Sequence, residues 1–315
     1  MPDFLELSEN QSRQYIDAQA LMRAQTEALE DAAQVRGSMI WRELRGVRYL
    51  IRTSAASAQK TIGRDSAETQ AIYARFIERK EAAAARVKSL GARLEEQRKL
   101  NRLYGVGRAP NVIVKVLEAL QKAGIAAQFL TVGTNAMYAY ESACGLRVGT
   151  EAMATRDLDL LFDTRQRTAF VSTLRRLDSS LLAVLRKADP SFRVLRNQLQ
   201  TAVNDDGYEI DIIRRTAKDG GPHPLRISAS EDDLWAVQVN SGENMVAGLK
   251  FRQLVVAASG QMAYMQTLHP LDFIRIKTVL ATDPQRDPLK RPKDKLQAEI
   301  TEALWDGYLQ HRDGD

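Results

Sequence analysis

Cysteine and histidine are scarce in this 315-residue chain, and their scarcity removes several kinds of site. Cys144 is the only cysteine, so an intrachain disulfide and a multi-cysteine zinc site are excluded. The three histidines are dispersed at positions 223, 269 and 311. A metal site built on sulfur or imidazole ligands is therefore not expected.

Long hydrophobic runs are also missing. No stretch approaches the 18 consecutive apolar residues of a membrane-spanning helix. The first thirty residues carry Asp3, Glu6, Glu9 and Asp17 and show no apolar run flanked by basic residues, so neither a secretory nor a transit peptide is visible. The sequence predicts a cytoplasmic protein without a membrane partner.

Proline is absent and glycine is rare between Ser8 and Leu103, where Ala, Gln, Glu, Arg and Leu dominate. This composition predicts long helices divided by a break near residues 63–66. The stretch from Tyr104 to Pro110, rich in glycine, ends the helical pattern. We expect residues 1–108 to form a helical, basic N-terminal module.

The net charge of +5 is distributed unevenly along the chain. Residues 1–35 hold two Arg against seven acids, residues 36–108 hold seventeen Lys or Arg against seven acids, and residues 109–315 hold 26 of each. A polyanion is expected to dock on the basic segment.

The predicted docking face consists of arginines at helical spacing. Several of Arg36, Arg42, Arg45, Arg48 and Arg52 would share one helical face and meet RNA phosphates together, with Trp41 and Tyr49 available to stack on bases. The alternative is a solvated face with salt bridges to the acidic first segment. Residues 1–35 could equally cover the basic face as a self-inhibitory arm, or form a homodimer contact through the N-terminal helices.

Beyond residue 109 the pattern changes to short mixed elements. Helices are predicted at 112–123, 136–144, 165–177, 270–280 and 292–309, and strands at 128–133, 158–162, 192–203, 208–213, 251–257 and 262–268. Their order indicates an α+β fold with a mixed sheet. We expect a core at 109–225 and a C-terminal hairpin and helical subdomain at 226–315.

Asp157 and Asp159 begin an apolar strand in the sequence Thr-Arg-Asp-Leu-Asp-Leu-Leu-Phe. Alternation along a strand places both carboxylates on one face and Leu158 and Leu160 on the other. Two neighbouring carboxylates repel unless a cation lies between them, and oxygen ligands suit Mg²⁺ or Mn²⁺. Alone, the pattern also fits a solvated turn or a helix cap.

Two further features strengthen this reading. Asp211 lies between Ile210 and Ile212 in a later apolar strand, where an isolated buried charge is costly; the alternative is an exposed alternating strand. Upstream, Gly133-Thr134-Asn135 links a strand to a helix, a junction whose backbone amides and hydroxyl suit phosphate oxygens.

The ordered motifs resemble the DNA polymerase β-type nucleotidyltransferase superfamily, and within it bacterial proteins of the nucleotidyltransferase fold. The resemblance covers about residues 110–305 and includes a tail that resembles the Pro-x-x-Phe, Lys and Lys-Asp-x-x-Gln-Ala helices of that group. The tail matches are His269-Pro270-Leu271-Asp272-Phe273, Lys277, Arg291-Pro292-Lys293-Asp294 and Gln297-Ala298. Thr134 stands where serine is commoner, and an insertion around 144–154 lengthens the spacing from Gly133 to Asp157.

The resemblance implies that Asp157, Asp159 and Asp211 bind two Mg²⁺ ions, which stabilise the attacking and leaving oxygens during transfer. It implies an NTP, such as ATP, as substrate, with nucleotide-binding residues distributed over both halves of the matched region. They are Gly133, Thr134, Asn135, Arg156, Lys277, Arg291, Lys293 and Asp294. For Lys277 a snorkelling lysine, for Arg156 a salt bridge and for Asp294 a helix cap are the plainer alternatives.

The predicted function is transfer of a nucleoside monophosphate to a hydroxyl of RNA, tRNA included, or of a protein. The basic module favours RNA, and the resemblance implies a role in toxin or defence systems. Two alternatives are a non-catalytic nucleotide- or nucleic-acid-binding module with the same fold and a small-molecule nucleotidyltransferase.

Overall fold

The computed structural model describes residues 4–55, 57–216, 222–228, 230–239, 245 and 248–311. The chain forms two compact units. One consists of Met1–Ser12 together with Asn101–Asp315, and the other of Arg13–Leu100. No described helix combines the length and the apolar character needed to cross a membrane.

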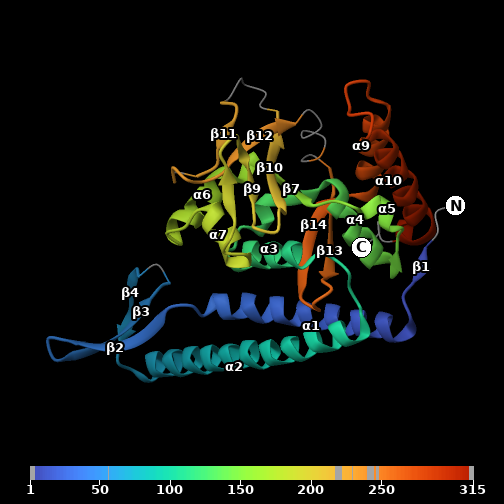
Figure 1. Ribbon diagram of the computed structural model, residues 1–315. Coiled ribbons are helices and arrows are strands. Elements are labelled where there is room, and N and C mark those ends of the chain that lie inside the picture. Colours follow the sequence, from blue (N-terminus) through green and yellow to red (C-terminus); the bar gives the residue numbers. More distant parts are fainter. Residues whose placement is uncertain are drawn as a thin grey trace. The chain divides into compact units, whose positions relative to one another are not determined.

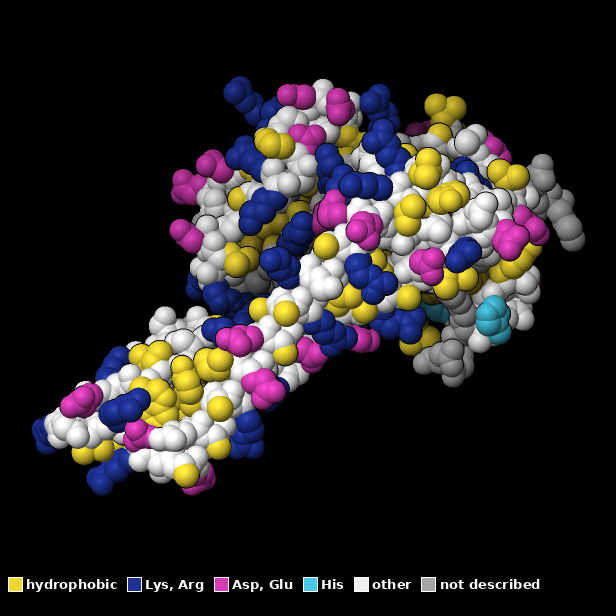
Figure 2. All heavy atoms as spheres, turned by 90° about the horizontal axis from the view of Figure 1, so that it is seen from below, with side chains coloured by type: hydrophobic (Ala, Val, Ile, Leu, Met, Phe, Trp, Pro, Cys, Tyr) yellow, Lys and Arg dark blue, Asp and Glu magenta, His cyan; other side chains and the backbone are white. Residues whose placement is uncertain are grey.

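The unit Arg13–Leu100 is built on a helical hairpin of α1 (Glu9–Gln34) and α2 (Ala67–Tyr104) (Figure 1). The two helices run antiparallel, because Gln14 near one end bonds Gln97 while Asp31 near the other end pairs with Arg86. Leu21, Ala28 and Leu90 form a small apolar cluster between them. In Figure 2, Lys and Arg side chains lie beside hydrophobic ones over this unit.

Residues 38–64 are not helical, so the sequence prediction of a helix there is wrong. They form the antiparallel strands β2 (Ser38–Leu44), β3 (Val47–Thr53) and β4 (Gln59–Arg64). The local residues explain the result, because Ile, Trp, Val, Tyr and Thr favour strands. Arg45 and Gly46, with φ of 51° and 75°, form the two-residue turn between β2 and β3, which requires positive φ at both positions.

The arginines expected on one helical face therefore lie on a sheet and divide between its two faces. Arg42 and Arg52 occupy strands β2 and β3, and Arg45 lies in the turn. Arg52 donates to the carbonyls of Arg36, Ser38 and Thr53. Its guanidinium also lies 4.4 Å from the ring centroid of Phe76 on α2.

Trp41 and Arg48 lie on the same helix-facing side of this sheet. The ring of Trp41 contacts Tyr73 of α2, with 6.0 Å between centroids, and the Arg48 guanidinium lies 5.2 Å from the Trp41 ring. Arg48 also pairs with Asp65 at 3.3 Å. Trp41 therefore packs inside the unit, whereas Tyr49 lies on the opposite face by strand alternation.

The larger unit contains a mixed sheet in the order β11-β12-β10-β7-β5-β14-β13, with β9 and β8 branching from β10. Its strands are β5 (Phe129–Val132), β7 (Asp157–Phe162), β8 (Arg193–Leu195), β9 (Gln198–Val203), β10 (Glu209–Arg215), β11 (Leu225–Arg226), β12 (Trp235–Val239), β13 (Lys250–Val256) and β14 (Met262–Leu268). Parallel pairs such as β7 with β10 and antiparallel pairs such as β13 with β14 occur together. The predicted α+β fold with a mixed sheet is confirmed.

Helices surround this sheet, and several bury one apolar face on it. They are α3 (Asn111–Lys122), α4 (Met137–Cys144), α5 (Thr150–Met153), α6 (Arg167–Arg176), α7 (Leu181–Ala188), α9 (Pro270–Thr282) and α10 (Arg291–Leu304). α3 contacts β14 and α7, α4 contacts β13, and α9 packs along α10. Fully buried residues such as Leu158, Leu160 and Phe162 of β7 place that strand in the centre of the core.

The elements predicted after residue 109 agree with the structure apart from four details. The helix α7 (Leu181–Ala188) was not anticipated. The strand predicted at 192–203 is a hairpin of β8 and β9. The region 144–154, expected to be an insertion, contains the short elements β6 (Leu146–Arg147) and α5. β11 and β12 were not anticipated, and they extend the sheet beyond β10.

Candidate functional site

The carboxylates of Asp157, Asp159 and Asp211 line one cavity of about 860 Å³. β7 and β10 are parallel neighbours, and Asp211 lies directly beside Asp159 in their register. Leu158 and Ile210, which alternate with them, are fully buried on the other face of the sheet. The sheet register thus brings together carboxylates that are about fifty residues apart in sequence.

Two of these carboxylates are oriented by threonine hydroxyls. The Thr155 hydroxyl donates to Asp157, and the Thr201 hydroxyl of the neighbouring strand β9 donates to Asp211. Within the described ranges, no group of three His, Cys, Asp or Glu side chains converges into a metal cage. The three aspartates therefore form a shared wall of the cavity in this conformation.

The carboxyl group of Asp159 has a strongly perturbed pKa. Its pKa is raised to about 7, first by burial and then by repulsion from Asp157 and Asp211, although Lys277 and Lys290 act in the opposite direction. Burial also raises the pKa of Asp211. Mutual repulsion of this kind is relieved by a bound cation, so the hard oxygen donors present here fit Mg²⁺ or Mn²⁺.

The turn at Gly133 lies directly against the carboxylate of Asp159. Val132 at the end of β5 is the register partner of Asp159, and Gly133 follows it with φ of 67°. A Cβ at position 133 would lie only 2.4 Å from the Oδ2 of Asp159. Glycine adopts this backbone conformation without strain, and any Cβ at position 133 would force the Asp159 carboxylate to shift.

Thr134 and Asn135 continue this turn as a short 3-10 helix, Gly133–Ala136, that leads into α4. Thr134 lines the cavity, and its hydroxyl oxygen accepts a bond from Gln297 at 3.0 Å. The hydroxyl proton therefore stays available to donate elsewhere. Asn135 is buried and donates to the backbone carbonyl of Asp157 at 2.5 Å, so it positions the start of β7.

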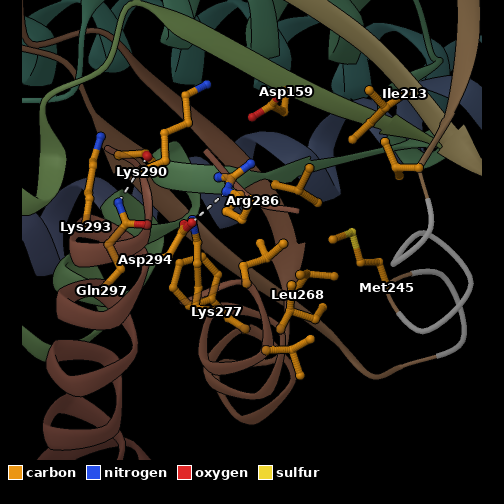
Figure 3. Close-up of a pocket in the computed structure, with 18 of the residues that line it drawn as sticks. Asp159, Ile213, Met245, Leu268, Lys277, Arg286, Lys290, Lys293, Asp294 and Gln297 are labelled. Atoms are coloured by element: carbon orange, nitrogen blue, oxygen red, sulfur yellow. Dashed lines mark hydrogen bonds and ion pairs between the residues drawn. The ribbon is translucent and has the colours of Figure 1, made fainter. Parts of the chain in front are cut away.

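The opposite wall is cationic and comes from α9, α10 and the loop between them. Lys277 bonds Asp294 at 2.7 Å, and Arg286 bonds the other oxygen of the same carboxylate at 2.9 Å. Figure 3 shows Lys277, Arg286, Lys290 and Lys293 gathered on this side of the cavity. These cations lie across the space from Asp159.

Burial modifies the acid–base behaviour of this wall. It lowers the pKa of Lys277, while the neighbouring Asp294 opposes that effect. Burial alone would raise the pKa of Asp294, but Lys277 and Arg286 outweigh it and hold that pKa below its usual value. Lys293, whose pKa is also lowered by burial, donates to the carbonyl of Ala154 at 2.5 Å.

Three predicted nucleotide-binding residues, Asn135, Arg156 and Arg291, lie outside the cavity lining formed by the described residues. Arg291 donates to the carbonyls of Pro284 and Arg286 and so holds the loop between α9 and α10. Arg156 donates to the carbonyl of Asp206 in the β9–β10 turn. Both arginines support segments that carry site residues.

The remaining side of the cavity is apolar. Ile213 and Met245 lie on the side away from Lys290 and Lys293 in Figure 3, and Leu268, Phe273 and Val239 also line the space. An apolar side beside a charged one suits a ligand with a flat heterocycle and a polyphosphate.

Several residues at the site were not predicted from the sequence. Arg286 and Lys290 line the cavity from the segment between the predicted helices 270–280 and 292–309, and Thr155 lines it just before Asp157. Thr201 does not line the cavity but bonds Asp211, and no motif marks it. The signal for the two cations was their closeness in sequence to Asp294. Gln297 belongs to the quoted helix motif, and its buried amide links Thr134 to the carbonyl of Ala152.

Comparison with known proteins agrees with this geometry. A family model described as nucleotidyltransferase matches residues 111–313, which is more than half of the chain. No curated protein and no solved structure matches this chain. The matched range includes all three aspartates, the glycine turn and the cationic helices, and the chain therefore belongs to this nucleotidyltransferase family.

Proposed function

We propose that the chain transfers a nucleoside monophosphate from an NTP to a hydroxyl of an RNA, with a protein hydroxyl as the other acceptor class. The observation that carries the proposal is the register pairing of Asp159 with Asp211 on a cavity wall that faces a cluster of cations. Membership of the nucleotidyltransferase family supplies the reaction class.

Asp157, Asp159 and Asp211 are the proposed ligands of divalent metal. Bound there, Mg²⁺ or Mn²⁺ would screen charge on the reacting phosphate and on the attacking oxygen. The threonine hydroxyls on Asp157 and Asp211 fix the orientation of the carboxylates, and Gly133 sets the position of Asp159. The carboxylates are thereby held in place before the nucleotide arrives.

The cationic wall is the proposed triphosphate site. Lys290 and Lys293 are the cations without a buried carboxylate partner among the described ion pairs, whereas Lys277 and Arg286 share Asp294. Their positive charge would stabilise the pyrophosphate as the bond between the α and β phosphates breaks. The acceptor oxygen forms the new bond to the α phosphorus, and its proton passes to solvent.

The experiment uses each of the four NTPs labelled at the α phosphate, with Mg²⁺ and either total RNA or total protein as acceptor. Label is expected in the RNA fraction with the native chain, and its loss is expected in Asp159→Asn and in the presence of a chelator. Nucleotide binding without labelled RNA or protein under any condition would favour a non-catalytic binding module. A role in toxin or defence systems remains a prediction from resemblance.

A further inference from the structure

The exposed face of the three-stranded sheet combines an aromatic ring with arginines. Tyr49 on the central strand β3 pairs in register with Arg42 on β2 and with Arg64 on β4. Register partners point to the same face, and neighbouring strands lie about 5 Å apart, so the two arginines flank the tyrosine within roughly 10 Å of each other.

This face lies opposite to the one that packs on α2. Trp41, Leu50 and Arg52 alternate with the exposed set and contact or face the helix. On the exposed side, Leu44 is 50% and Val47 is 37% exposed beside the turn. Ile51, farther along the same face, is buried, so the open area is the end of the sheet nearest the turn.

The charge of this region is strongly one-sided. Residues 36–64 contain seven Lys or Arg and a single acid, Glu43. Glu43 is the register partner of Arg48 and therefore lies on the helix-facing side. The strands thus place no carboxylate on the face that carries Arg42, Tyr49 and Arg64, as far as the described residues extend.

The chemistry of this face matches single-stranded RNA. An aromatic ring stacks on an unpaired base, arginines on either side meet neighbouring phosphates, and apolar side chains cover the edge of the base. The electrostatic attraction needs no particular sequence. Arg42 donates to the neutral side chain of Gln59 at 3.3 Å, so this contact leaves its charge unneutralised.

We propose that the face formed by Arg42, Tyr49 and Arg64 is a docking surface for single-stranded RNA, an inference that rests on the proposed RNA acceptor. The surface replaces the helical arginine face expected from sequence. It excludes Trp41 and Arg52, which are held inside the unit, and it adds Arg64.

The test measures binding of a fluorescently labelled single-stranded RNA of mixed sequence to the full chain by anisotropy, without NTP. Tyr49→Ala is expected to raise Kd roughly tenfold, whereas Tyr49→Phe, which keeps the ring, retains the native affinity. Arg42→Gln with Arg64→Gln is expected to weaken binding and to reduce the slope of log affinity against log salt by about 1.4.

The matched control removes two exposed arginines from α2, Arg79→Gln with Arg93→Gln. It changes the net charge by the same amount and is expected to leave Kd within about twofold, since the slope depends on phosphate contacts and not on total charge. Circular dichroism and the melting temperature verify that each variant is folded.

Equal weakening by both double variants, or no change with Tyr49→Ala, would overturn the proposal. Absence of RNA binding by the native chain would overturn the proposal as well. The apolar residues Leu44 and Val47 beside the turn would then favour a protein partner. Asp159→Asn is expected to abolish nucleotidyl transfer and keep RNA affinity. Docking and catalysis can therefore fail separately in these measurements.

Discussion

The backbone of Gly133 and the carboxylate of Asp159 are in such close contact that a single added methyl group at position 133 would lie 2.4 Å from Oδ2. Gly133 follows β5, Asp159 lies within β7, and the two strands are antiparallel neighbours. A change in the Gly133 turn, the proposed phosphate site, would therefore also move the carboxylate of Asp159, a proposed metal ligand.

Gly133→Ala is expected to reduce transfer at least tenfold, because the added methyl group displaces Asp159. Gly145→Ala is the matched control: Gly145 has the same φ of 67°, but a Cβ there would meet nothing within 4 Å. In both variants, alanine in the left-handed backbone region lowers the free energy of unfolding by about 1–2 kcal/mol. Equal activity in the two variants, measured as kcat/KM, would show that the contact has no catalytic consequence.

Asp159→Asn is expected to change how stability depends on pH. The pKa of Asp159 is raised to about 7 in the folded chain from 3.8, so the folded state binds the proton more tightly. The contribution of Asp159 to the free energy of unfolding is full below about pH 4 and falls as pH rises to about 7. The neutral Asn avoids this loss, which is at most about 4 kcal/mol.

The melting temperatures of the native chain and Asp159→Asn should therefore diverge between pH 4 and pH 7, with the variant higher at pH 8. Adding Mg²⁺ at pH 8 is expected to stabilise the native chain and to have less effect on the variant, because ligand binding to the folded state raises its stability. Parallel pH profiles would contradict the electrostatic coupling of the three aspartates.

Lys290→Gln is expected to weaken NTP binding by roughly tenfold, the value of one charge-assisted hydrogen bond to phosphate. Lys290 is exposed in the structure, so its replacement should leave the fold intact. Lys295→Gln is the control, since Lys295 lies on α10 and pairs with Glu299 instead of lining the cavity. Calorimetric titration with NTP distinguishes the two; similar affinities would remove Lys290 from the triphosphate site.

Asp294→Ala is expected to destabilise the chain by about 3 kcal/mol, because it leaves the buried ammonium of Lys277 without its partner. Glu299→Ala in the same helix removes an exposed ion pair with Lys295 and should cost about 0.5 kcal/mol or less. Urea unfolding of both variants provides the comparison. A similar loss in the two would mean that burial does not strengthen the Lys277–Asp294 pair.

The core of the fold was predictable where local pattern and tertiary packing agree. The alternation of Asp157 and Asp159 with buried leucines identified β7, and the Phe251–Leu268 region was recognised as a hairpin. The register between strands, and hydrogen bonds between side chains far apart in sequence, could not be predicted because they depend on tertiary packing. Nothing near Thr201 in sequence indicates that it would bond Asp211 from β9.

The error at residues 38–64 has a specific cause. Arginine spacing was read as helical although strand-favouring residues separate the arginines, and the two-residue turn at Arg45-Gly46 was not recognised. Once the segment is a sheet, alternate residues face opposite ways. The arginines therefore differ in role: Arg52 packs inside the unit, whereas Arg42 lies on the exposed face.

The contacts of Arg52 are internal to the unit Arg13–Leu100. Its guanidinium donates to three backbone carbonyls and stacks on Phe76. Arg52→Lys keeps the charge but loses the planar fork, so it is expected to lower the melting temperature while RNA affinity of the folded protein is unchanged. Arg45→Lys in the exposed turn should have little effect on melting. Loss of RNA affinity in Arg52→Lys without any loss of stability would contradict a structural role and return Arg52 to the docking surface.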